Sequence, residues 1–168
     1  MFSYVARQPI LDLNMQVIAY ELLFRDGKSN SFPNIDPNQA TSNILTNNHL
    51  TLGVENITGD LPAYINFHSE TLIRHFPSFL DPKNIVIEVL EDVELSEALI
   101  ASIKSLKEKG YTLALDDHDF DPKWAVLFPY IDIIKIDVLA FSLLEISKFI
   151  RKLKHLDVIL LAEKVETA

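Results

Sequence analysis

The sequence contains no cysteine among its 168 residues. This absence excludes a disulfide framework, thiolate metal ligands and a cysteine nucleophile. The chain also lacks any run of about 18 apolar residues, the length that a membrane span needs, and its first residues do not have the basic and apolar segments of a signal peptide. We therefore expect a cytoplasmic protein with no membrane partner.

Basic residues are also scarce. The chain has 15 Lys and Arg against 24 Asp and Glu, which gives a formal net charge of −9. Such a field repels nucleic acid polymers, so these are not expected as partners. A smaller phosphate ligand would need a local cation, either a metal ion or a few well-placed Arg and Lys side chains.

The length and the apolar patterning predict one α/β domain over residues 1–168. A segment with apolar residues at helical spacing begins after Ser96, a plausible N-cap, and stops at Gly110, so a helix is expected there. Two further helices are expected over residues 37–49 and 146–157. Apolar strands separated by helices imply a parallel sheet covered by helices. The expected strands are residues 1–16, with a turn at 12–14, then 17–26, 62–67, 84–91, 111–117, 131–137 and 157–163.

Polar residues come late in six of these strands. Glu88 and Asp116 are 28 residues apart, and so are Lys135 and Glu163, a spacing that suits one strand-helix unit. Successive units therefore deliver a polar group to the same end of the sheet, where parallel barrels assemble their active sites. The full set is Glu21, Asn66, Glu88, Asp116 with Asp117, Lys135 and Glu163.

A cluster of carboxylates in an apolar setting predicts bound cations. Burying unpaired carboxylates costs several kcal/mol each, and their mutual repulsion adds to that cost. Oxygen ligands suit hard ions such as Mg²⁺ or Mn²⁺ better than Zn²⁺. The adjacent Asp116 and Asp117, with Lys135 near them, suggest two ions that activate water for attack on a phosphate ester.

The ordered motifs of the chain resemble those of EAL domains, the barrel-shaped phosphodiesterases that linearise the bacterial second messenger cyclic di-GMP. Residues 20–25 are similar to the signature that gives the family its name, and they have Leu22 where the family usually has Ala. The resemblance extends from Arg7 to Thr167. Within the family, the chain is most similar to the branch in which an EAL domain precedes an HDOD domain. The matching segments are "RQPI", "YELLFR", "INFH", "IEVLE", "LALDD", "IIKID" and "AEKVET".

The resemblance implies a role for each matching residue. Lys135 would hold the attacking water or a bridging oxygen, Glu163 would complete the metal and water network, and Glu91 would steady the loop after the Asp pair. Gln8 and Arg25 would contact the ligand, Arg25 through its phosphate. The ligands of one metal would be Glu21, Asn66, Glu88 and Asp116, and Asp117 would be shared with a second metal.

The sequence also departs from the family pattern. After the Asp pair the family continues with a glycine-rich loop, whereas this chain has His118, Asp119, Phe120, Asp121 and Pro122. His118 is expected to be solvated, with a catalytic role as the less favoured alternative. A second departure, Lys164, stands where Gly is usual and places a cation beside Glu163.

The resemblance also bears on the extent of the barrel. A complete TIM barrel needs about 250 residues, so the (β/α) barrel is expected to be incomplete at its C-terminal end, lacking the last strand-helix unit. A homodimer or another signalling protein could cover the exposed sheet edge. An HDOD domain could follow in a longer native chain.

Three functions remain open from the sequence. The first is a metal-dependent phosphodiesterase acting on cyclic di-GMP, with activity that could be reduced or lost. The second is a catalytically inactive regulatory module that binds cyclic di-GMP or protein partners. The third, a phosphosugar isomerase barrel, is disfavoured because no glycine-rich phosphate loop occurs late in the chain.

Overall fold

The computed structural model describes residues 4–25 and 54–165. It contains one sheet of seven strands in the order β1-β2-β3-β4-β5-β6-β7. Strands β1 and β2 are antiparallel, and each following pair is parallel. The strands are β1 Tyr4–Leu11, β2 Val17–Arg25, β3 Ala63–Phe67, β4 Ile85–Val89, β5 Thr112–Leu115, β6 Ile133–Asp137 and β7 Ile159–Glu163.

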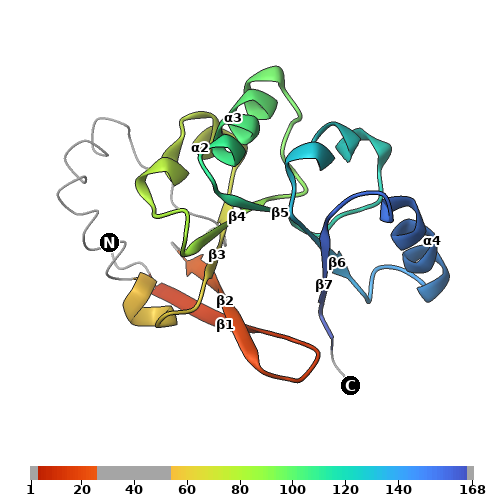
Figure 1. Ribbon diagram of the computed structural model, residues 1–168, viewed down its shortest axis with the longest axis horizontal. Coiled ribbons are helices and arrows are strands. Elements are labelled where there is room, and N and C mark those ends of the chain that lie inside the picture. Colours follow the sequence, from red (N-terminus) through yellow and green to blue (C-terminus); the bar gives the residue numbers. More distant parts are fainter. Residues whose placement is uncertain (1–3, 26–53, 166–168) are drawn as a thin grey trace.

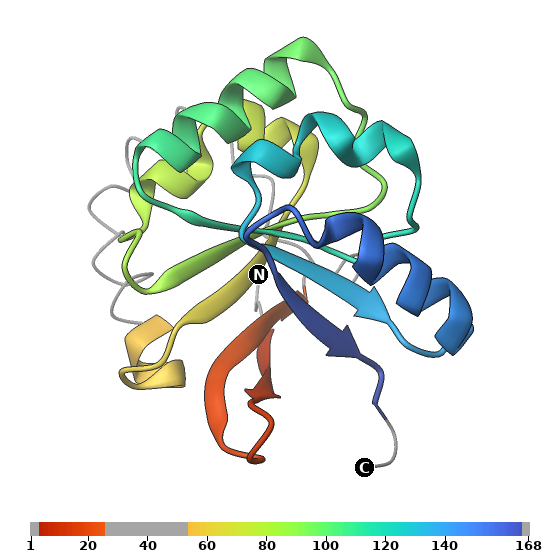
Figure 2. The same cartoon turned by 45° about the vertical axis from the view of Figure 1, so that its right-hand side comes forward.

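The sheet curls into part of a barrel, with helices along its outer side (Figures 1 and 2). This arrangement confirms the expected TIM-barrel-like α/β class. The expected helix over residues 37–49 lies outside the described residues. Residues 54–58 are helical. The further helices are α2 Ser69–Ile73, α3 Glu97–Glu108 and α4 Leu143–Leu153, and the short 3-10 helices are η1 Phe76–Phe79, η2 Pro122–Val126 and η3 Phe128–Tyr130.

Local sequence explains where the two longer helices begin. The Ser96 hydroxyl accepts a hydrogen bond from the Leu99 amide and caps α3, as predicted. Helix α4 begins at Leu143, earlier than the expected start at residue 146, because Ser142 and Glu145 form a capping box. The apolar periodicity alone could not reveal this first turn, since Leu143 and Leu144 are exposed.

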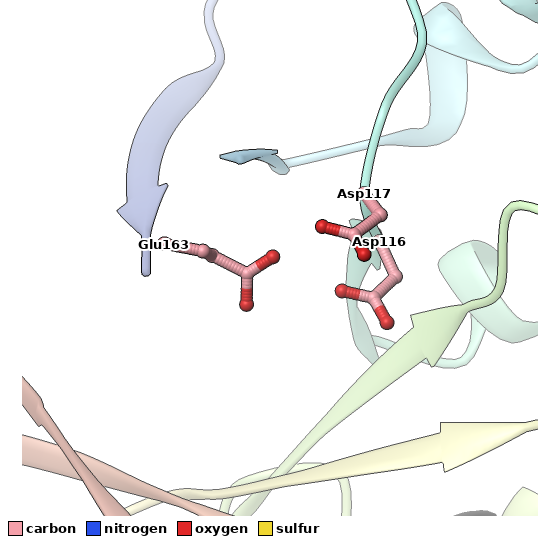
Figure 3. A group of neighbouring side chains, drawn as sticks. All are labelled: Asp116, Asp117 and Glu163. Atoms are coloured by element: carbon pink, nitrogen blue, oxygen red, sulfur yellow. The ribbon is translucent and has the colours of Figure 1, made fainter. Parts of the chain in front are cut away.

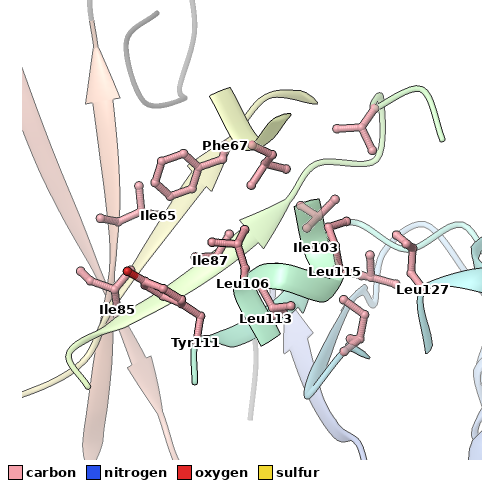
Figure 4. Packing of buried hydrophobic residues seen from close by; sticks show 14 of the residues in the cluster. Ile65, Phe67, Ile85, Ile87, Ile103, Leu106, Tyr111, Leu113, Leu115 and Leu127 are labelled. Atoms are coloured by element: carbon pink, nitrogen blue, oxygen red, sulfur yellow. The ribbon is translucent and has the colours of Figure 1, made fainter. Parts of the chain in front are cut away.

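The two faces of the sheet carry different apolar clusters. The larger cluster lies between the outer face and the helices, where Ile103 and Leu106 of α3 lie beside Ile87 and Leu113 (Figure 4). Leu99 of the same helix belongs to this cluster. A smaller cluster lies on the inner face of the curl. It consists of Ile10, Ala19, Tyr64, Val86, Ala114 and Ile133, with Leu161 against it. Because side chains two residues apart on a strand share a face, the residues two positions away from this second cluster also lie on the inner face.

Candidate functional site

On strands β2 to β7, a polar residue follows each apolar residue of the inner cluster at a spacing of two, and the remaining residue, Ile10, lies on the antiparallel β1. Side chains two apart on a strand share a face, so these polar groups all lie on the inner face, towards the carboxyl ends of the strands. The apolar cluster therefore forms a floor beneath them. The pairs are Ala19 with Glu21, Tyr64 with Asn66, Val86 with Glu88, Ala114 with Asp116, Ile133 with Lys135 and Leu161 with Glu163.

The Lys135 side chain is the centre of this cluster. Its Nζ lies 2.6 Å from Oε1 of Glu88, 2.6 Å from Oδ1 of Asp116 and 2.8 Å from Oε1 of Glu163. The Glu21 Oε2 is farther, at 3.4 Å. Lys135 is only 1% exposed. The site thus surrounds one buried ammonium with four carboxylates from four different strand ends, and a net negative charge remains.

Several buried polar atoms of this cluster lack a hydrogen-bond donor. Asn66 donates its amide to Oε1 of Glu21 at 3.3 Å, but its own Oδ1 accepts nothing. Neither oxygen of the fully buried Glu88 receives a hydrogen bond of good geometry, although Oε1 is close to Lys135. Buried acceptors without partners are rare in folded proteins, and a bound cation is one way to satisfy them.

The charges of the cluster shift one another's pKa values. Burial raises the pKa of Glu88 well above its ordinary value, and Lys135 opposes that shift. Burial also raises the pKa of Glu163, to about 7. For Lys135, burial lowers the pKa, but the carboxylates of Glu88, Asp116, Glu21 and Glu163 outweigh it and the net shift is upward. Lys135 is therefore a permanent cation, and Glu163 can exchange a proton near neutral pH.

A second group of carboxylates lies next to the first. Asp116, Asp117 and Glu163 can each place one oxygen within 4.8 Å of the others, and Figure 3 shows Glu163 pointing across towards the two Asp side chains. The Lys164 Nζ lies 3.2 Å from Oδ2 of Asp117 and 2.5 Å from Oδ2 of Asp137. Two potential cation positions, joined by Asp116 and Glu163, therefore adjoin at this end of the barrel.

Asp137 is a member of the site that the sequence predictions did not include. It lies two residues after Lys135 and is level with Glu163 on the neighbouring strand. Its pKa is lowered, chiefly by the hydrogen bond from Lys164. The signal was available, because the spacing of two from Lys135 places Asp137 on the same face of β6.

The other predicted site residues lie around this cluster. Gln8 is exposed on β1 directly opposite Glu21. Glu91 is exposed in the turn after β4, and its pKa is raised by partial burial and then by the charges of Asp116 and Asp117. Arg25 is the last residue of β2, and its side chain lies outside the described residues.

The expectation of a solvated His118 is wrong. Its side chain is 1% exposed and lies among the rings of Phe120, Trp124, Phe128 and Phe149, at centroid distances between 4.9 and 6.1 Å. Neither ring nitrogen has a hydrogen-bond partner, and burial lowers the pKa of His118 to about 4. His118 is therefore a neutral core residue that anchors the loop after Asp117. A glycine at this position would have no side chain to pack among these rings.

Comparisons with known proteins give related sequences and folds. No protein-family model matches the chain. The chain is 40% identical over 150 residues to cyclic di-GMP phosphodiesterase CdgJ of Vibrio cholerae. This alignment covers 89% of this chain and 35% of CdgJ. Two structures align along the chain. YkuI of Bacillus subtilis, solved with cyclic di-GMP and calcium, has a TM-score of 0.66 at 20% identity, covering 98% of this chain and 50% of YkuI. An EAL domain protein of Listeria monocytogenes has a TM-score of 0.68 at 18% identity, covering 99% and 79%.

The fold and the site together define a general class of protein. A curled, mainly parallel sheet with polar groups at the carboxyl ends of its strands is a barrel-type α/β domain with its chemistry at that end. Within that class, the structural neighbours show that the chain has the EAL-domain fold. The chain spans about a third of the length of CdgJ. No helix in the described ranges is long and apolar enough to cross a membrane.

Proposed function

We propose that the chain is a metal-dependent phosphodiesterase domain that hydrolyses cyclic di-GMP to the linear dinucleotide. The observation that carries the proposal is the convergence of acidic and amide side chains from several strand ends around the buried Lys135. Two comparisons support the choice of substrate. CdgJ is named a cyclic di-GMP phosphodiesterase, and YkuI was solved with cyclic di-GMP described as its substrate.

The residues present fit a divalent ion. Oδ1 of Asn66 and the oxygens of Glu88 are buried acceptors without hydrogen bonds, and they lie beside carboxylates that carry excess negative charge. All donors are oxygens, which favours Mg²⁺ or Mn²⁺. Glu21, Asn66, Glu88 and Asp116 would hold one ion, and a second ion would have to share Asp117 with the Lys164 ammonium. When bound, the ions would supply Lewis-acid stabilisation of the phosphate and a more acidic water.

The protein's own side chains would position and deprotonate the water. Lys135 stays charged, so its ammonium would hold the attacking water or a bridging oxygen. Glu163, with a pKa of about 7, can accept the proton that the water loses. The water oxygen would bond to phosphorus while one phosphodiester P–O bond breaks, and the departing ribose oxygen would take up a proton. Hydrolysis of that single bond would give the linear product.

The remaining residues would bind the substrate or shape the loop. Gln8 faces the same side of the hairpin as Glu21, so it is placed to contact a ligand above the cluster. We retain Arg25 as the phosphate-binding residue and Glu91 as the residue that steadies the loop carrying Asp117. A cytoplasmic location, a homodimer or signalling partner, and membership of the EAL-HDOD branch are further parts of the proposal.

The test is a hydrolysis assay with cyclic di-GMP and Mn²⁺ or Mg²⁺, run beside equilibrium binding of the same ligand. We expect turnover that is abolished by chelation and by Glu21→Ala. Glu108→Ala, which removes an exposed carboxylate on α3, is the matched control and should leave turnover unchanged. Binding without turnover in the unaltered chain would instead identify the inactive regulatory module. Absence of both would leave only a role in protein interaction.

A further inference from the structure

We propose that Lys164 is a built-in cation that takes the place of a second divalent ion beside Asp117. This inference rests on the proposed metal-dependent function. The chain would then hold a single divalent ion, at the Glu21, Asn66, Glu88 and Asp116 position, where a site without this lysine would hold two.

The first step is the position of the Lys164 ammonium. It lies 3.2 Å from Oδ2 and 3.5 Å from Oδ1 of Asp117. Asp117 is one of the three residues whose carboxylate oxygens can gather within 4.8 Å, together with Asp116 and Glu163. The Lys164 ammonium therefore already pairs with a carboxylate that an added ion would use.

The second step is that Asp137 holds Lys164 in place. The Lys164 Nζ is 2.5 Å from Oδ2 of Asp137. The other Asp137 oxygen accepts hydrogen bonds from the amides of Leu139 at 2.8 Å and Ala140 at 3.2 Å. Since the turn after β6 fixes this carboxylate, its ion pair keeps the Lys164 ammonium close to Asp117.

The third step is the backbone that directs the two side chains together. Lys164 has φ 56° and Asp117 has φ 36°, both in the left-handed region that non-glycine residues rarely adopt. Each residue directly follows a member of the central cluster, Glu163 and Asp116 respectively. The left-handed backbone at these two positions directs the side chains of Asp117 and Lys164 away from the central cluster and towards each other.

Electrostatics then decides the number of ions. An ammonium at contact distance from Asp117 repels a divalent ion that uses the same carboxylate. Lys164 also neutralises charge that a second ion would otherwise neutralise. Lys135 opposes an ion at the central position in the same way, but that position also keeps two buried acceptors without a donor, Oδ1 of Asn66 and Oε2 of Glu88. Neither residue pairs with Lys164, so the lysine that distinguishes the outer position leaves this driving force intact.

The experiment counts Mn²⁺ bound to the full chain by titration calorimetry and by electron paramagnetic resonance, without substrate. We expect one tightly bound ion in the unaltered chain. Lys164→Gln should bind a second ion at least about tenfold more tightly than the unaltered chain does, and should give the spin-coupled signal of a dinuclear site. Lys164→Arg should keep a single ion. Lys104→Gln, which removes a similarly exposed lysine paired with Glu108, controls for net charge.

The outcomes separate this inference from the proposed function. Two ions in the unaltered chain, a single ion in Lys164→Gln, or a second ion in Lys104→Gln would overturn the inference, even if cyclic di-GMP is hydrolysed. The expected counts with no hydrolysis by any variant would support the inference while the proposed function fails. No binding by any variant would overturn both. Circular dichroism and thermal unfolding would confirm that each variant is folded.

Discussion

Two lysines at the same end of the barrel pair with carboxylates in opposite surroundings. Lys135 is buried among four carboxylates and its side chain is 1% exposed, whereas Lys164 pairs with two and is 50% exposed. Their pKa values are both shifted upward. The difference shows that burial decides what an ion pair does, because a charge removed from the interior leaves its partners stranded while a surface charge is replaced by water.

The largest effect should come from removing the inner lysine. Lys135→Met leaves Glu88, which is 0% exposed, without its cation, so we expect a loss of about 3 kcal/mol in the free energy of unfolding at neutral pH. Lys164→Met, the matched change at the outer lysine, should cost less than about 1 kcal/mol. Urea unfolding in the presence of a chelator measures both. Equal losses would show that the two lysines do not differ as their burial indicates.

The next effect concerns the loop that carries the partner of the outer lysine. His118→Ala should lose about 2 kcal/mol of unfolding free energy because a cavity opens among Phe120, Trp124 and Phe149. His118→Leu fills that space without an unpaired polar group and should be nearly neutral. If His118→Leu abolished turnover with stability unchanged, the anchoring role would be wrong and a catalytic one would follow.

A smaller effect is the pH dependence of the inner cluster. The folded-state pKa of Glu163, about 7, is raised above its unfolded value, so the folded state binds more protons between these two values. In a chelator, stability should therefore be highest below the unfolded pKa and should fall, by about 1 kcal/mol, as pH rises through 7. Glu163→Gln should reduce that slope, and the raised pKa of Glu88 accounts for the slope that remains. Thermal unfolding from pH 5 to pH 8 tests this, and a rise in stability over the range would contradict the assignment.

The smallest effect separates backbone strain from ion pairing at the outer lysine. Lys164→Ala loses the ion pairs and keeps the left-handed φ of 56°, whereas Lys164→Gly loses the pairs and relieves the strain. We expect the Gly variant to be more stable than the Ala variant by about 1 kcal/mol. Identical chemical denaturation midpoints for the two variants would mean that the junction after β7 relaxes when the lysine is removed.

Much of the fold could be predicted from the sequence because its patterns are local. Apolar strand runs, the Ser96 cap and the 28-residue spacing of polar groups needed no knowledge of distant contacts. The same reasoning predicted a common end of the sheet for the residues that surround Lys135. Strand periodicity carried this information, since a spacing of two places a polar residue directly beyond the apolar floor.

Other features depend on contacts that no local pattern encodes. His118 was misplaced because its environment comes from rings on η2, η3 and α4, whose packing is decided by the tertiary fold. The spacing of two from Lys135 could have placed Asp137 on the inner face, but its pairing with Lys164, 27 residues later in the chain, could not be predicted locally. The position of Lys164 beside Asp117 depends on two left-handed residues, and sequence gives no sign of positive φ at a lysine.

The apolar floor beneath the cluster has a consequence for the order in which ligands bind. Tyr64, Val86 and Ile133 are buried and close the inner face from below, so ligands approach from the carboxyl ends of the strands. There they meet four carboxylates with only one ammonium among them, a negative field that repels a phosphodiester. A divalent ion would have to arrive first, and the cyclic dinucleotide second. Binding of cyclic di-GMP should accordingly be undetectable in a chelator and should return with Ca²⁺, giving the reaction a compulsory sequence that begins with the metal.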